Sequence, residues 1–194
     1  MQDLWLEYGA AIYAVVFVWT FFEGETIVLV GGAAARLFGA PDPLLLFACA
    51  WIGSFLGDQC WFLLGRRYGR KLLDRRPKLA AKADKALALL DRHGVAFIMS
   101  FRFLYGVRNV ASVSIGMSAM SWRRFATLNF VAAALWAASF VGGGYFLGAL
   151  LGVKGVALLL LGIVLTALVA VLVRHWLRVR ATRRAARPLV AAGD

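Results

Sequence analysis

Three long runs of apolar residues constrain the fold of this chain more than any other feature. They span Leu44–Gly65, Trp122 to about Leu147, and Val156–Trp176. About 20 helical residues cover the roughly 30 Å hydrocarbon core of a bilayer, so each run is long enough to cross it. Apolar residues make up 62% of the 194 residues and charged residues only 16%, which excludes a soluble single-domain enzyme and a disordered chain. The sequence therefore predicts an all-α membrane protein.

The basic residues are concentrated in two connections beside these runs, at residues 66–92 and 174–187. Cytoplasmic loops of membrane proteins carry an excess of Lys and Arg, so both regions are predicted to be cytoplasmic. Residues 75–92 have the apolar spacing of an amphipathic helix lying on the membrane surface, with a solvated linker helix as the alternative. The net charge of +12 comes with no nucleic-acid recognition motif, so anionic lipid headgroups are the expected partner and nucleic acid is not.

Two other apolar segments, residues 8–38 and 94–120, do not fit simple crossings. Given the orientation of their neighbours, both ends of the first should lie outside and both ends of the second in the cytoplasm. Such segments are predicted to be re-entrant hairpins, which are tolerated at membrane depth only when buried in protein or facing a wet cavity. One hairpin from each side is the arrangement of an inverted repeat. An internal offset of 83 residues supports the repeat, because it places Gly65 on Gly148 and Glu25 on Arg108.

These segments form one predicted transmembrane domain, residues 1–176, followed by a basic cytoplasmic tail, residues 177–194. The order within the domain is hairpin 8–38, transmembrane helix 44–65, basic amphipathic segment 66–92, hairpin 94–120, transmembrane helix 122–147 and transmembrane helix 156–176. The predicted fold is thus a repeat of a re-entrant helical hairpin followed by a transmembrane helix, with one further transmembrane helix at the C-terminal end.

Five charged residues lie inside apolar segments, where each costs about 2.5–3.5 kcal/mol near the bilayer centre. They are Glu23, Glu25, Asp58, Arg102 and Arg108. We expect the acids of the first hairpin to pair with the arginines of the second, and Asp58 either to join them or to cap a neighbouring hairpin. Two interpretations stay open. The cluster is either a static lock between the hairpins or a hydrated cavity that binds a charged headgroup or relays protons.

The sequence offers no sign of an enzyme or of a bound cofactor. No Ser-His, Cys-His or metal-ligand arrangement lies at membrane depth, and no cluster of His, Cys and carboxylates has the spacing of a metal site. We therefore expect neither catalysis nor a metal or other cofactor.

Three sequence strings are similar to those of the DedA family, also called the SNARE-associated or VTT-domain membrane proteins. They are FFEGETIVLVGGAAA, GSFLGDQCWFLLGRRYGR and HGVAFIMSFRFLYGVRNVASVSIGMSAMSWRRF, followed by Asn129 and Trp136. The resemblance implies an integral inner-membrane protein with two inverted re-entrant hairpins, in many members a homodimer. It also implies a proton-motive-force-dependent transporter, and several members act as flippases or scramblases for undecaprenyl phosphate or phospholipids. The family's essential acids would fall on Glu23 and Glu25, and its paired arginines on Arg102 and Arg108.

The chain departs from the family pattern at both hairpin tips. Only Gly24 separates the two acids, and Tyr105 stands where many members have proline. The expected function is a lipid or lipid-phosphate translocase in which the arginines bind the headgroup and the acids couple protons. A proton-coupled carrier of a small ion or drug and a non-transporting assembly factor are the alternatives.

Overall fold

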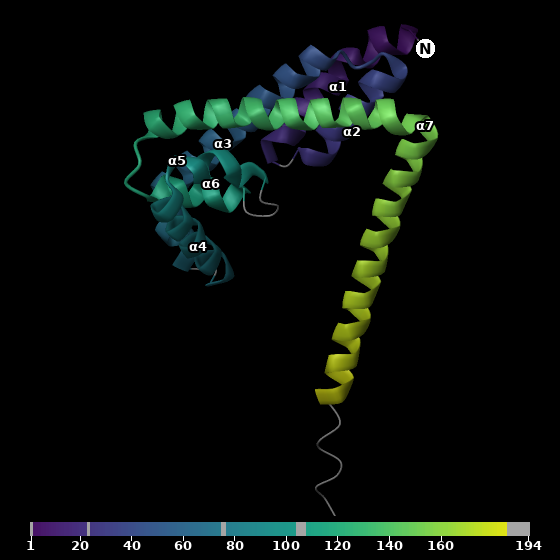
Figure 1. Ribbon diagram of the computed structural model, residues 1–194. Coiled ribbons are helices and arrows are strands. Elements are labelled where there is room, and N and C mark those ends of the chain that lie inside the picture. Colours follow the sequence, from purple (N-terminus) through teal and green to yellow (C-terminus); the bar gives the residue numbers. More distant parts are fainter. Residues whose placement is uncertain (1, 23, 75–76, 104–107, 186–194) are drawn as a thin grey trace, which may run out of the picture. The chain divides into compact units, whose positions relative to one another are not determined.

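The computed structural model describes residues 2–22, 24–74, 77–103 and 108–185, and every element within them is a helix (Figure 1). In chain order these are α1 (Gln2–Phe22), α2 (Glu25–Phe38), α3 (Pro43–Asp74), α4 (Pro77–His93), α5 (Val95–Ser100), the 3-10 helix η1 (Phe101–Phe103), α6 (Arg108–Met117) and α7 (Trp122–Ala185). The chain divides into two compact units, Met1–Leu150 and Leu151–Asp194. The predicted all-α class is confirmed for the described residues.

Among the described residues, two helices are long and apolar enough to cross a membrane. Their candidate spans are Pro43–Gly69 and Trp122–Gly162, and they contain the first two predicted runs. α3 does not end at Gly65 as predicted but continues to Asp74, because the Arg and Lys residues that follow are good helix formers and no proline interrupts them. α7 covers both later runs, 122–147 and 156–176, and non-helical backbone at Gly152 (φ 63°, ψ −175°) divides it into two helices between these runs, as predicted.

Each predicted hairpin contains described helices from both of its halves. In the first, α1 ends at Phe22 and α2 begins at Glu25, after the N-cap residue Gly24. In the second, α5 and η1 precede α6, and residues 104–107 between them lie outside the described residues. That these segments form re-entrant hairpins, and that the two hairpins enter a bilayer from opposite sides, stay predictions.

α6 packs on α3 with the two backbones in direct contact. A Cβ atom added to Gly65 of α3 would overlap the carbonyl oxygen of Val113, and one added to Gly116 of α6 would overlap that of Phe62. No side chain fits at either glycine, and small residues are what allow such close approach between helices in membranes. The two glycines therefore fix the second hairpin against the long helix of the first half of the chain.

α2 packs on α7 in the same way. A Cβ atom on Gly144 of α7 would overlap the carbonyl oxygen of Leu29, and one on Gly32 of α2 would overlap that of Val141. Leu29 and Gly32 precede their counterparts in α6, Val113 and Gly116, by 84 positions. The chain thus contains a structural repeat in which the second helix of each hairpin packs on the long helix of the other half.

The alignment of α3 with α7 expected from the sequence is wrong by about one helical turn. The offset of 83 residues aligns Gly65 of α3 with Gly148 of α7. The residue of α7 whose contact corresponds to that of Gly65 is instead Gly144. The reason is that α2 has 14 residues and α6 has 10, so α7 begins 79 positions after α3. The offset does hold at the start of the second hairpin helices, since Glu25 and Arg108 are the first residues of α2 and α6.

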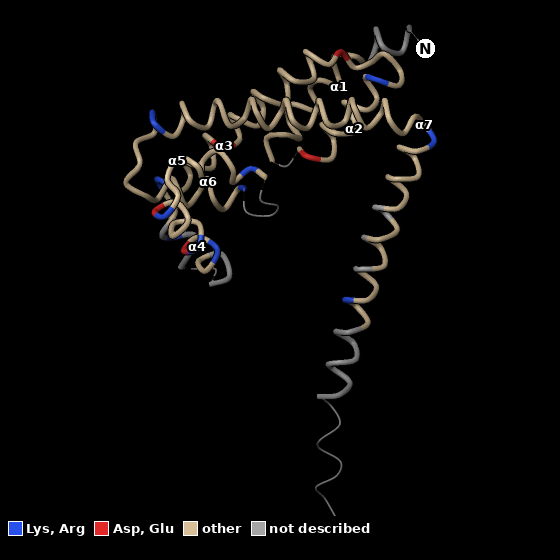
Figure 2. The backbone as a smooth tube through the Cα atoms, viewed as in Figure 1, with Lys and Arg blue, Asp and Glu red and all other residues tan. Residues whose placement is uncertain are grey.

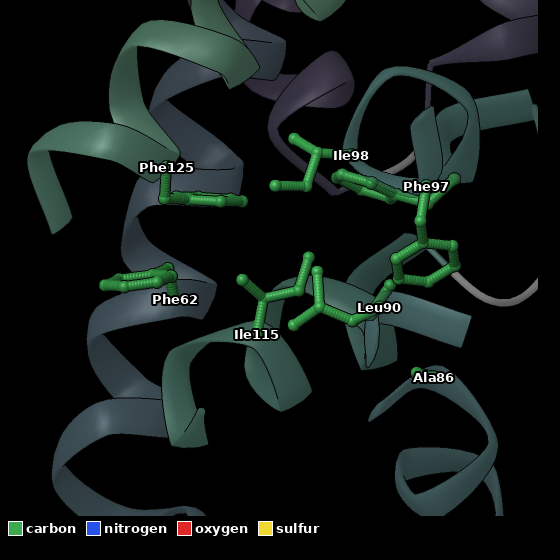
Figure 3. Close-up of a cluster of buried hydrophobic side chains, with 9 residues drawn as sticks. Phe62, Ala86, Leu90, Phe97, Ile98, Ile115 and Phe125 are labelled. Carbon is green, nitrogen blue, oxygen red and sulfur yellow. The ribbon is translucent and has the colours of Figure 1, made fainter. Parts of the chain in front are cut away.

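The amphipathic helix predicted over residues 75–92 is α4, but its apolar face is buried against protein. Ala83 and Ala86 are at most 1% exposed, and Leu90 is 6% exposed. Leu90 joins the cluster of Figure 3, which also contains α5, α6 and the stacked rings of Phe62 and Phe125, 4.5 Å apart. This face is therefore not free to lie on the membrane surface, because α5 and α6 already cover it.

Candidate functional site

A buried ion-pair cluster lies where α3, η1 and α6 meet. Charges are sparse along α1, α2 and the first part of α7, whereas both signs gather on α4 (Figure 2). Asp58 of α3 is fully buried and receives two guanidinium groups. Nη2 of Arg102 contacts its Oδ2 atom, and Nε of Arg108 donates to its Oδ1 atom at 3.3 Å. One carboxylate therefore pairs with two arginines, one from η1 and one from the start of α6.

Arg102 is held by three side chains from two long helices. Besides Asp58, its Nη1 atom donates to Oγ of Ser54, and its Nη2 atom donates to Oδ1 of Asn129 at 2.8 Å. Ser54 lies one turn before Asp58 on α3, and Asn129 lies on α7. All four residues are 1% exposed or less, so the short helix η1 is tied to α3 and α7 in the interior of the unit.

Arg108 connects the cluster to the end of α1. Its Nη2 atom donates to the carbonyl oxygens of Thr20 at 3.1 Å and Ser54 at 3.2 Å, and to Oγ of Ser54 at 2.9 Å. Its guanidinium carbon lies 5.4 Å from the ring centre of Trp136, within the range of a cation–π contact. The next residue, Asn109, donates to the carbonyl of Phe22 at 3.3 Å. The start of α6 is thus bound to the end of α1.

Several N–H donors in or beside this cluster have no acceptor among the described residues. They are Nε of Arg102, Nη1 of Arg108, Nδ2 of Asn129 and Nε1 of Trp136. The two arginines and Asp58 also carry a formal charge of +1 together. Buried donors are nearly always hydrogen-bonded, and guanidinium groups match the geometry of phosphate and carboxylate oxygens. The cluster therefore has the chemistry to bind an anionic oxygen group.

Glu25, one of the two acids of the first predicted hairpin, does not pair with the arginines as expected. Glu25 is the first residue of α2, is partly buried and forms no ion pair with Arg102 or Arg108 within the described part of the chain. Its position is favourable for a carboxylate, because it faces the positive end of the helix dipole. Glu23 lies outside the described residues. Of the two roles considered for Asp58, the structure confirms that it joins the arginines.

Sequence reasoning assigned no role at the cluster to Ser54 or Thr20. A signal for Ser54 exists, since it precedes Asp58 by four residues and therefore shares its helix face. Thr20 contributes a backbone carbonyl, for which side-chain chemistry gives no signal. Trp136, which follows the three family-like strings, is fully buried beside Arg108.

Comparison with known proteins identifies relatives over nearly the whole chain. Residues 22–146 match the VTT domain family. The chain is 37% identical to the inner membrane protein YohD of Escherichia coli, over 75% of this chain and 73% of that protein. It is 30% identical to the protein DedA of Escherichia coli, over 96% and 92% of the two chains, and 30% identical to the uncharacterized membrane protein ML0287 of Mycobacterium leprae, over 88% and 78%. No solved structure matches significantly.

Proposed function

The chain belongs to the VTT-domain family of membrane proteins, also called the DedA family, and from this premise we propose that it translocates a lipid or lipid phosphate across a bacterial membrane. The name of the relative YohD supports an inner-membrane location. In the proposed topology, residues 66–92 and the C-terminal end lie in the cytoplasm, and the hairpins 8–38 and 94–120 enter the bilayer from opposite sides.

The buried cluster of Asp58, Arg102 and Arg108 carries this proposal. A lock between helices would be most stable with matched charges and every donor paired, because unpaired buried charge and unmet donors are costly. Among the described residues, the cluster instead has one carboxylate for two guanidiniums, and it has donors without acceptors. A phosphate oxygen would supply both the missing charge and the missing acceptors.

The proposed mechanism divides the work between the arginines and the acids. Arg102 and Arg108 bind the anionic headgroup while the lipid tails stay in the hydrocarbon phase. Glu25, at the start of α2, and Glu23 before it exchange protons and so couple translocation to the proton motive force. Protonation of either acid would remove a negative charge at the junction of α1 and α2. A nearby anion would then be repelled less, so proton binding would directly affect anion binding.

Reconstitution into vesicles tests the proposal. Vesicles containing a fluorescent phospholipid or a fluorescent polyprenyl phosphate are treated with a membrane-impermeant quencher, which reaches only the lipid in the outer leaflet. We expect the protein to raise the quenched fraction well above one half, and Arg102→Lys or Arg108→Lys to abolish this rise, because Lys cannot make bidentate contacts with phosphate.

Arg124→Lys serves as the matched control, since Arg124 is an exposed arginine of α7 with no side-chain contact in the cluster. It should translocate lipid as the unchanged protein does. Full activity of both cluster variants would contradict the proposed headgroup site. Uptake of a small ion or drug without lipid movement would favour the carrier alternative, and neither activity would favour an assembly factor.

A further inference from the structure

A second feature of the first hairpin has no role in the mechanism above. A hollow of about 460 Å³ lies between α1, α2 and the beginning of α3. Every residue that lines it is apolar, among them Ile12, Val15, Val16, Ile27, Val30 and Leu46. A hollow of this size is within the range of pockets that hold small ligands, roughly 300–1,000 Å³, and its lining admits only an apolar occupant.

The size of the hollow limits what kind of apolar group enters it. An α-helix is about 10–12 Å wide with its side chains, so roughly one turn of helix would fill the volume. A hydrocarbon chain is thin and flexible, so the volume of the hollow does not restrict its entry in the way that it restricts a helix. The small residues Ala11, Gly31 and Ala34 lie among the larger lining residues, and they leave the space that branched side chains would occupy.

α1 connects this hollow to the charged cluster. Val16 lines the hollow, and Thr20, one turn further along the same helix, accepts a hydrogen bond from Arg108 at 3.1 Å. Val16 and Leu46 also pack in one apolar cluster with Trp136, whose ring lies beside the guanidinium group of Arg108. From Thr20 to Ile12 the helix covers about 12 Å at 1.5 Å per residue. A residue that lines the hollow and the carbonyl group that Arg108 contacts thus lie one turn apart on α1, so the tail of a lipid whose phosphate lay at Arg108 would be within reach of the hollow.

We propose that the hollow between α1, α2 and α3 binds one hydrocarbon tail of a lipid whose phosphate contacts Arg108. This inference rests on the proposed function and adds the tail to the headgroup as a recognised part of the substrate. Recognition of both parts selects a lipid phosphate over a free phosphate, since only the lipid has a hydrocarbon chain that can enter the hollow.

Photo-crosslinking of the full-length protein in vesicles tests the tail site. The probe is phosphatidylglycerol with a diazirine near the end of one acyl chain, and the adducts are located by mass spectrometry of peptides. We expect at least fivefold more adducts at Ile12 and Val30 than at Leu135, a residue of α7 that is 53% exposed and serves as an ordinary lipid-facing position. Equal labelling of the hollow and of Leu135 would overturn the proposal.

Ala34→Phe and Ala11→Phe fill the hollow from its two walls, so that one variant remains if the other does not fold. Each should reduce the adducts in the hollow at least fivefold, whereas Ala138→Phe, at an exposed position of α7, should not. Unchanged adducts in the filled variants would overturn the tail site. Absence of adducts in the unchanged protein, as when a helix from residues 156–176 or from a second copy fills the hollow, would overturn it as well.

Lipid translocation measured on the same vesicles separates this proposal from the proposed function. Translocation that depends on Arg108, without preferential labelling of the hollow, overturns the tail site alone. Preferential labelling in a protein that moves no lipid overturns the proposed function, and the hollow is then a site for a bound structural lipid.

Discussion

Asp58 contributes differently to the charge balance of the buried cluster than either arginine does. It is the single described acid that pairs with both Arg102 and Arg108, and its side chain is completely buried. Loss of one arginine leaves a balanced pair of one carboxylate and one guanidinium. Loss of Asp58 leaves two guanidinium groups in the interior without that counter-charge. The three residues are therefore not equivalent, although all three are charged groups in the same apolar surroundings.

Asp58→Asn should destabilise the protein strongly. An uncompensated buried charge typically costs about 3–5 kcal/mol, and Asn keeps the size of the side chain while removing its charge. We expect a large fall in the midpoint of thermal unfolding in detergent, followed by tryptophan fluorescence.

Asp84→Asn, at an exposed position of α4, is the matched control and should change the free energy of unfolding by about 0.5 kcal/mol at most. A stable Asp58→Asn protein would mean that the arginines have another counter-charge, for which Glu23 or Glu25 would be the candidates. The double variants with Glu23→Gln and Glu25→Gln would then identify which.

At the scale of the helices, close backbone contact decides how the two halves fit together. α2 packs on α7, and α6 packs on α3, each through glycines that leave no room for a Cβ atom. At these contacts the two backbones touch directly rather than through apolar side chains, so the distance between the helices depends on the glycines. A methyl group there must move a whole helix rather than a side chain.

Gly144→Ala should weaken the contact between α2 and α7. Its Cβ atom would overlap the backbone carbonyl of Leu29, which is not free to rotate away, and such overpacking costs about 1–3 kcal/mol. Gly142→Ala, two residues earlier on α7, meets no atom within 4 Å and should be neutral or stabilising, because Ala favours helix over Gly by up to about 1 kcal/mol. Thermal unfolding of the two variants side by side measures the difference, and equal midpoints would contradict the packing.

The start of α3 depends on one capping residue. Oδ1 of Asp42 accepts hydrogen bonds from the backbone N–H groups of Leu44 and Leu45, each at 2.9 Å, and Pro43 occupies the first helical position. Asp42→Ala should therefore cost about 1 kcal/mol of stability, and Asp42→Asn should cost little because Asn is as good a cap. We expect the Asp42→Ala variant to unfold at a lower temperature than the Asp42→Asn variant. Identical effects of the two changes would show that the cap contributes nothing.

At the scale of the whole molecule, the charged cluster lies entirely within one compact unit, Met1–Leu150. The family match, residues 22–146, falls inside the same unit. The residues of the cluster and of the family match therefore belong to one unit of the chain.

A chain that ends at Ala181 should keep its fold and its activity. The truncation removes the basic residues 182–194 but keeps Arg178 and Arg180, so a positive charge still follows the apolar run. Membrane insertion is measured by fractionation and lipid translocation by the quenching assay described above. Loss of both would show that the tail has a role that its sequence does not indicate.

The orientation of the whole chain is tested by cysteine labelling. In a protein without Cys49 and Cys60, a single cysteine in place of exposed His93 at the end of α4 should react with an impermeant maleimide only after the membrane is opened. The reason is that residues 66–92 carry ten Lys and Arg residues, an excess typical of cytoplasmic loops. Reaction in intact cells would overturn the proposed orientation and, with it, the opposite entry of the two hairpins.

The sequence alone was sufficient for features that depend on local composition. Apolar length identified the long helices, and the acidic Glu23–Glu25 stretch located the break between α1 and α2. The cost of charge in hydrocarbon was enough to single out Asp58, Arg102 and Arg108. These properties follow from neighbours along the chain, so they can be read from the order of residues.

The tertiary structure alone decided which of these groups meet. Arg102 and Arg108 pair with Asp58, about 50 residues away in sequence, and within the described residues neither pairs with Glu25. The apolar face of α4 turned out to be covered by α5 and α6, and the shorter α6 moved the repeat register by one turn. Pairing, coverage and register depend on how distant helices approach one another. That approach is set by glycine contacts whose partners the sequence does not specify, because any small residue in an apolar run permits contact with any helix.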